Sequence, residues 1–156
     1  MKILIAYDTK YGNTEKVAKL IAEGISSIEG NEVIVKNVKD VKLKKEDSYD
    51  VIVIGSPNHF GRHIRSVKKF ITKLPKSQLK VKTYAVFDTC IAPGFEKAVK
   101  AMEKQISETM PNLIKASPGL SIKVAGMGAS KGPIVDEDLP KCKEFGIKLI
   151  QEYKSL

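Results

Sequence analysis

The chain has 156 residues, of which 42% are hydrophobic and 29% are charged. This is the length of one ordinary domain with its own core, and the composition excludes an intrinsically disordered chain. No apolar run approaches the roughly 18 residues that a membrane-spanning helix needs, and residues 3–7 are too short for a signal-peptide core. We therefore expect one folded domain over residues 1–156, located in the cytoplasm.

The formal net charge of +9 raises nucleic acid, an anionic membrane and acidic proteins as partners. Nearly all of this charge is lysine, because Arg62 and Arg65 are the only arginines. The basic stretches also lack interleaved aromatic residues that could stack on bases, which argues against nucleic acid. Two distant cysteines and two histidines give neither a disulfide framework nor a set of metal ligands. We expect no metal, no nucleic acid and no membrane.

The chain begins with a strand, a tight loop and a helix. Residues 2–7 are an apolar run without alternation, which is typical of a strand covered on both faces. Apolar residues then recur with helical spacing over residues 17–28, and Gly30 provides a stop.

Two strands and a second helix follow. Residues 32–38 and 51–54 indicate strands, joined by an exposed basic connection over residues 39–48. Gly55 and Pro57 are expected to end the third strand. Apolar positions over residues 64–74 form one face of a helix.

The last third repeats the same alternation. Residues 83–87 and 120–125 indicate the fourth and fifth strands, residues 126–132 a Gly-rich loop, and residues 139–153 a final helix. The apolar face of the intervening helix is predicted to contain Phe95, Ala98, Val99, Met102 and Ile106. Five strands alternating with helices predict an α/β fold with a doubly wound parallel sheet. Its ligand crevice lies at the carboxyl ends of strands, where the strand order reverses.

The loop after the first strand carries small, polar and hydroxyl residues and opens directly into a helix. Its candidate binding residues are Thr9, Lys10, Tyr11, Gly12, Asn13 and Thr14. Backbone N–H groups, hydroxyls and the positive end of a helix together can hold a phosphate. The spacings G-x-x-x-x-G-K-[ST] and G-x-G-x-x-G are absent here, which argues against nucleoside triphosphates and dinucleotides.

The third and fourth strands end in loops that suit a flat ring. The candidates are Ser56, Pro57, Asn58, His59, Phe60 and Gly61 after the third strand, and Asp88, Thr89, Cys90 and Gly94 after the fourth. Small residues allow close backbone approach, amides reach ring heteroatoms and an aromatic covers a face. A phosphate loop beside two such loops predicts a mononucleotide site with a planar head.

At these residues the chain resembles the flavodoxin family, whose phosphate loop follows [ST]-x-[ST]-G-x-[ST]. Thr9, Gly12, Asn13 and Thr14 match that pattern. The resemblance implies a flavodoxin-like sheet of five parallel strands in the order 2-1-3-4-5 with helices on both faces. It also implies FMN as cofactor, with its phosphate on the first loop and its isoalloxazine between the other two. The Trp or Tyr that commonly sandwich this ring have no counterpart here.

Residues 7–16 are also similar to the flavodoxin module of flavo-diiron proteins, and residues 55–61 to flavodoxin-like NAD(P)H:quinone reductases. The resemblance therefore implies an FMN-binding electron carrier between redox proteins, with no catalytic side chain. Given the charge of +9, the partners are expected to present acidic surfaces, and the carrier to be a monomer or a weak dimer. The alternatives are an FMN-dependent NAD(P)H:quinone reductase and a regulatory or structural module without cofactor.

Several candidate residues admit two interpretations from sequence. His59 is either a surface residue or a ring contact. Asp88 ends a buried strand, so its carboxylate either contacts flavin or caps the following helix. Cys90 is either a small loop residue or a redox thiol. The third-strand loop is expected to make the main ring contacts, with N–H groups of residues 88–90 at the pyrimidine edge.

Overall fold

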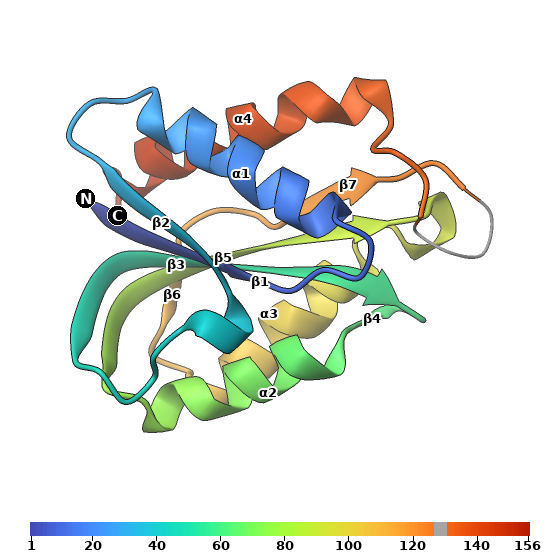
Figure 1. Ribbon diagram of the computed structural model, residues 1–156. Helices are drawn as coiled ribbons and strands as arrows, with labels where there is room; N and C mark the ends of the chain where they lie inside the picture. Colours follow the sequence, from blue (N-terminus) through green and yellow to red (C-terminus); the bar gives the residue numbers. More distant parts are fainter. Residues whose placement is uncertain (127–130) are drawn as a thin grey trace.

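Helices pack on both faces of a central sheet in the computed structural model, which describes residues 1–126 and 131–156 (Figure 1). The strands are β1 Lys2–Tyr7, β2 Glu32–Asn37, β3 Asp47–His59, β4 Arg62–His63, β5 Leu79–Cys90, β6 Ile114–Lys115 and β7 Leu120–Lys123. The helices are α1 Asn13–Ser26, α2 Arg65–Lys73, α3 Lys97–Thr109 and α4 Leu139–Tyr153, and the short 3-10 turns include η1 Val38–Asp40 and η3 Ala92–Gly94.

The sheet is parallel along the path β2-β1-β3-β5, and both β6 and β7 pair with β5. With β5 and β7 as the fourth and fifth strands, this confirms the predicted doubly wound order 2-1-3-4-5. The order reverses between β1 and β3, because β2 pairs on one side of β1 and β3 on the other. A ligand site is therefore expected where β1 and β3 end.

Successive residues of the central strands enter two different cores. Ile3 and Ile5 pack with α1 and α4 on one face of the sheet. Leu4 and Ala6 point the other way and pack with α2 and α3. This period of two explains the unbroken apolar runs in the sequence, since both faces of each strand are covered by helices.

The central strands are longer than predicted, and Gly55 and Pro57 do not end β3. The reason is local: Asp8 N donates to Gly55 O at 3.3 Å, and β1 ends at Tyr7, opposite Gly55. The backbone nitrogen of Pro57, two residues later, faces the same side of β3 as Gly55 O, but β1 has already ended there. On its other side β3 still pairs with β5, as far as Thr89. The N–H that Pro57 lacks therefore costs no ladder hydrogen bond.

The assignment of Phe95 to the core was wrong. Its side chain is 45% exposed, and α3 begins only at Lys97, after Glu96 in a left-handed conformation with φ 59°. Phe95 therefore lies before the helix begins, so the helical spacing that predicted its burial does not apply to it. The other four predicted positions, Ala98, Val99, Met102 and Ile106, are buried. Residues 127–130 of the expected Gly-rich loop lie outside the described residues.

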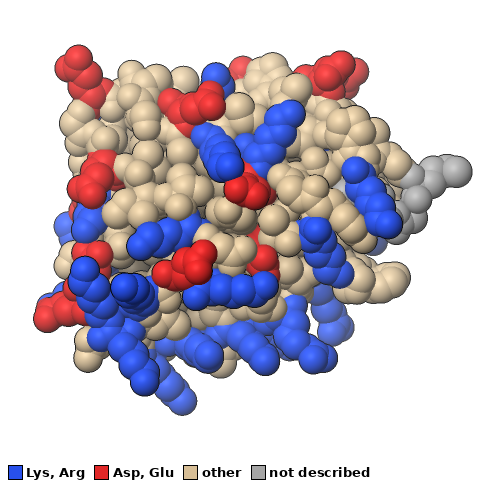
Figure 2. Space-filling view, in the orientation of Figure 1, with Lys and Arg blue, Asp and Glu red and all other residues tan. Residues whose placement is uncertain are grey.

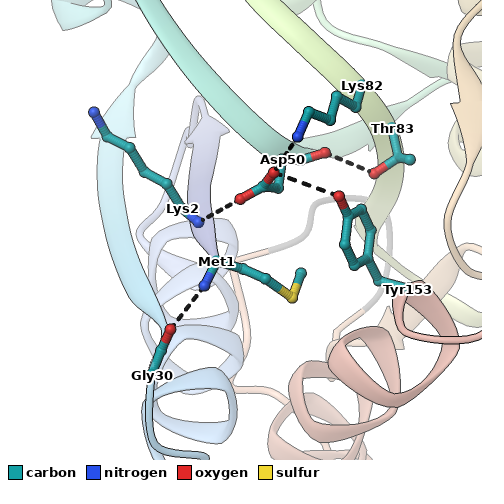
Figure 3. Close-up of polar contacts among 7 residues, drawn as sticks. All are labelled: Met1, Lys2, Gly30, Asp50, Lys82, Thr83 and Tyr153. Carbon is teal, nitrogen blue, oxygen red and sulfur yellow. Dashed lines mark hydrogen bonds and ion pairs between the residues drawn. The ribbon is translucent and has the colours of Figure 1, made fainter.

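Asp50 connects several elements at the amino ends of the parallel strands (Figure 3). It accepts hydrogen bonds from Lys2 N and Lys82 Nζ, each at 2.9 Å, and from the Tyr153 hydroxyl at 3.4 Å. Its backbone carbonyl accepts from Thr83 Oγ1 at 2.9 Å. These contacts join β1, β3, β5 and α4, and the hydrogen bond from Lys2 N is the main cause that lowers the pKa of Asp50.

Candidate functional site

A cavity of about 330 Å³ lies at the carboxyl ends of β1, β3 and β5. This volume falls within the range of small-molecule sites. It is lined by Thr9, Lys10, Tyr11, Asn13, Thr14, Pro57, Asn58, His59, Phe60, Gly61, Thr89, Ile91, Pro93, Gly94 and Lys97. The structure thus brings together twelve of the sixteen residues singled out from sequence. Gly12, Ser56, Asp88 and Cys90 are not among the lining residues.

The first wall of the cavity is the loop between β1 and α1. Gly12 has φ 94°, a left-handed conformation that favours glycine, and its N–H donates to Thr9 Oγ1 at 2.9 Å. Helix α1 starts at the next residue without a side-chain cap. Thr14 is buried in the first turn, with its Oγ1 2.9 Å from Thr89 Oγ1. The uncapped end of a 14-residue helix, beside these hydroxyls, is a site for an anion.

Asp8 holds the base of this loop, a role that sequence reasoning missed. Its buried carboxylate accepts hydrogen bonds from Thr9 N at 2.8 Å, Asn37 Nδ2 at 3.0 Å and Ser66 Oγ. Burial opposes ionisation, but the hydrogen bonds from Ser66, Asn37 and Thr9 outweigh it and hold the pKa of Asp8 below its ordinary value. A carboxylate directly after a buried strand was the available signal.

The second wall is a hairpin formed by the end of β3 and β4. Its two turn residues, Phe60 and Gly61, have φ 51° and 77°. Left-handed residues at both positions are typical of the tight turns that join antiparallel strands, and a bulky side chain there is strained. Phe60 is 93% exposed, and its ring lies edge-on to the His59 ring, with 4.5 Å between the two ring centroids. Lys10 Nζ reaches from the first loop to 3.2 Å from His59 Nδ1.

The third wall follows β5 and is tied to the hairpin by Asn58. Asn58 Nδ2 donates to Gly94 O at 2.7 Å, while Oδ1 accepts from Gly61 N at 2.8 Å. Ser56 lies beneath, where its Oγ donates to Pro57 O at 2.9 Å and accepts from Ile64 N at 3.0 Å. Ser56 thus supports the hairpin from below.

Asp88 and Cys90 are buried under the third wall. The Asp88 carboxylate accepts from Val99 N at 3.1 Å and from Ser121 Oγ, so it caps α3, one of the two roles left open by the sequence. Burial raises the pKa of Asp88 to about 6. Burial also raises the pKa of Cys90 to about 11, which keeps the thiol protonated at neutral pH. The structure therefore gives no support to a redox role for Cys90.

Lys97 is a lining residue that the sequence analysis did not single out. It is the first residue of α3, where a cation opposes the helix dipole. A lysine near the start of a helix, where the helix dipole disfavours a cation, was the signal available. With Lys10 it brings positive charge to a cavity whose described lining contains no Asp or Glu.

Within residues 1–126 and 131–156, no cluster of His, Cys, Asp or Glu is suited to hold a metal ion. Nor does that part of the chain contain a helix long and apolar enough to cross a membrane.

Comparison with known proteins points to one family. Residues 4–127 match the family model described as a flavodoxin domain. A flavodoxin of Aquifex aeolicus is 44% identical over 69 residues, and one of Clostridium saccharobutylicum is 36% identical over 101 residues. These alignments cover 44% and 64% of this chain, but only 37% and 63% of those two relatives.

Among solved structures, a flavodoxin from the domain Archaea superposes with a TM-score of 0.77 at 26% identity, covering 99% of both chains. Flavodoxin 1 of Bacillus cereus gives 0.74 at 25% identity, covering 97% of this chain and 98% of that one. The strand order, the β1–α1 loop and these structural similarities agree with the match of residues 4–127 to the flavodoxin domain model. The chain belongs to the flavodoxin family, as that match shows.

Proposed function

We propose that this protein binds FMN in the cavity at the ends of β1, β3 and β5 and carries electrons between redox proteins. The observation that supports this best is the uncapped N-terminus of α1, with its hydroxyl-bearing loop, opening into a cavity with walls from two further loops. A phosphate and a flat ring require these two neighbouring environments. Bound FMN would supply the electron chemistry, and the protein its position and electrostatics.

In this proposal the phosphate lies on the β1–α1 loop, with Thr9 and Thr14 as hydroxyl partners. The ring lies between the hairpin residues 58–61 and residues 91–94, where Phe60, Ile91 and Pro93 supply apolar surface. The backbone N–H groups of residues 88–90, which the sequence places at the pyrimidine edge of the ring, are not part of this proposal, because these residues lie inside β5, paired with β3 as far as Thr89 and with β7 as far as Cys90.

The charges around the cavity bear on how readily the flavin is reduced. Lys10 and Lys97 line the cavity, and its described lining contains no carboxylate. Negative charge that develops on a reduced ring is stabilised by nearby cations. We therefore expect full reduction to be easier than in strongly acidic flavodoxins.

The phosphate site is tested by comparing FMN with riboflavin, which lacks the phosphate. The double variant Asn13→Ala, Thr14→Ala should bind FMN at least about 30-fold more weakly, because hydrogen bonds to a charged group contribute about 1.5–3 kcal/mol each. Its affinity for riboflavin should fall by no more than about 3-fold. Thr72→Ala, at an exposed site on α2, is the matched control. Flavin fluorescence quenching measures both affinities, and equal losses for both ligands would place the phosphate elsewhere.

The electron-carrier role is tested on the flavin-loaded protein. A yellow protein that NADPH does not bleach is the expected result. Bleaching by NADPH would replace this proposal with the NAD(P)H:quinone reductase, and failure to take up any flavin would replace it with a cofactor-free module.

A further inference from the structure

The charge of this protein is segregated along the chain. Residues 51–87 contain no Asp or Glu, although the whole chain has 18 acidic residues. The basic residues of this segment are Arg62, Arg65, Lys68, Lys69, Lys73, Lys76, Lys80 and Lys82. Lys80 and Lys82 form ion pairs with Glu46 and Asp50. The other six have no ion-pair partner within the described part of the chain, so their charge acts outward.

Three of these six residues, Lys69, Lys73 and Lys76, line a groove between α2 and the chain that follows β2. Lys39 also lines it, but its Nζ lies 3.6 Å from Asp8 Oδ2 in an ion pair. The groove has a volume of about 520 Å³. Its apolar side chains are Val38, Val41, Leu43 and Phe70, and its lysines are Lys39, Lys44, Lys69, Lys73 and Lys76. We call it the lysine groove. Figure 2 shows basic side chains gathered along the lower part of the molecule, where α2 lies in Figure 1.

The lysine groove is continuous with the proposed flavin site. A second hollow beside it shares Lys39 and Ser66 with the groove. The same hollow shares Lys10, His59 and Phe60 with the flavin cavity. A protein seated on the groove would therefore extend to the exposed tip of the hairpin.

We propose that the lysine groove is the docking site for a redox partner protein that presents an acidic patch around an apolar side chain. This proposal rests on the proposed electron-carrier function and names the surface through which the carrier would bind its partner. Unpaired lysines steer an acidic partner and fix its orientation, while an apolar floor favours a partner that buries an apolar side chain. The groove offers lysine rather than arginine and no exposed aromatic for base stacking, which favours protein over nucleic acid.

The test uses the flavin-loaded protein with a rubredoxin of net negative charge as the probe. The groove variant is Lys69→Gln, Lys73→Gln, Lys76→Gln. The control variant is Lys143→Gln, Lys148→Gln, Lys154→Gln, on α4 and the residue that directly follows it, across the sheet. Both variants remove three exposed positive charges, so their net charge is matched and the location differs. Lys143 and Lys148, unlike the groove lysines, also form ion pairs, with Glu23 and Glu152.

Stopped flow measures the step in which one electron leaves the reduced flavin and converts ferric rubredoxin to ferrous. At about 20 mM ionic strength the groove variant should react about 10-fold more slowly than wild type, and the control variant no more than about 2-fold. At about 0.5 M salt the difference should disappear, because the Debye length then falls to about 4 Å. Equal effects of the two variants would overturn the proposal.

Calorimetric titration with oxidised rubredoxin separates docking from electron transfer. Binding weakened at least about 5-fold by the groove variant alone supports the docking site. If that selectivity appears without any electron transfer, the docking site stands and the carrier function fails. Absence of rubredoxin binding, or tighter binding of a 20-base-pair duplex DNA through the same lysines, would overturn the docking site.

Discussion

Gly146 on α4 lies so close to Gly24 on α1 that a Cβ added to Gly146 would stand 3.3 Å from the carbonyl carbon of Gly24. The same added atom would overlap Ile21 O, and one added to Gly24 would overlap Lys143 O. Backbone atoms cannot swing aside as side-chain ends do. The two helices therefore cross at a distance that only glycine permits at both positions.

We predict that Gly24→Ala and Gly146→Ala each destabilise the protein. Alanine raises helix propensity by about 1 kcal/mol, but forcing extra volume into a packed contact costs about 1–3 kcal/mol. The net effect should be a loss in the free energy of unfolding, measured by urea denaturation. Gln151→Ala, at an exposed site on α4, should leave stability nearly unchanged. A stabilised Gly146→Ala would mean that helix propensity outweighs the contact.

The sequence predicted what depends on local pattern. The buried strands, the alternation with helices and the phosphate-type loop all follow from residues close together in the chain. Pro57 was misread because its tolerance depends on where a neighbouring strand ends, and Phe95 because helical phase was extended across a non-helical residue. The Gly24 contact and the link from Asn58 to Gly94 join distant segments, and one sequence carries no local sign of either.

Asn58 provides the second prediction, because one side chain fixes both ring-binding loops. Asn58→Ala removes hydrogen bonds to Gly94 O and from Gly61 N. Two lost hydrogen bonds of about 1 kcal/mol each should weaken riboflavin and FMN alike, by about 10-fold or more. Asn112→Ala, on the surface away from the cavity, is the control. A loss confined to FMN would show that Asn58 acts on the phosphate instead.

Phe60 provides the third prediction, because two substitutions separate the backbone strain at this residue from the contacts that its ring makes. A left-handed bulky residue costs about 1–2 kcal/mol, which glycine relieves and alanine does not. We expect Phe60→Gly to stabilise the flavin-free protein and Phe60→Ala to leave it nearly unchanged. Both should weaken riboflavin binding by about 5-fold, because both remove the ring. Phe95→Ala should leave binding unchanged, and a larger effect there than at Phe60 would move the ring contact to residues 91–95.

The fourth prediction concerns the pH dependence that Asp88 gives to folding. Burial raises its pKa from 3.8 to about 6, so between these values the folded state holds a proton that the unfolded chain has lost. Stability must then fall as pH rises from about 4 to about 6 and level off above. A shift of about two pKa units corresponds to about 3 kcal/mol. The other carboxylates with a shifted pKa in the described part of the chain all have lowered values, so the stability they contribute is lost as pH falls below about 4.

Asp88→Asn isolates this contribution, because asparagine keeps an acceptor but cannot ionise. The stability of the variant relative to wild type should improve by about 2.5 kcal/mol between pH 4 and pH 7, whatever the constant cost of the altered hydrogen bonds to Val99 and Ser121. Urea denaturation of the flavin-free proteins at pH 4, 5, 6 and 7 measures this difference. Asp47→Asn is the matched control: its pKa is about 2, so its difference from wild type should stay nearly constant over the same range. A flat profile for Asp88→Asn would mean that the hydrogen bonds from Val99 N and Ser121 Oγ offset the burial and keep the carboxylate ionised.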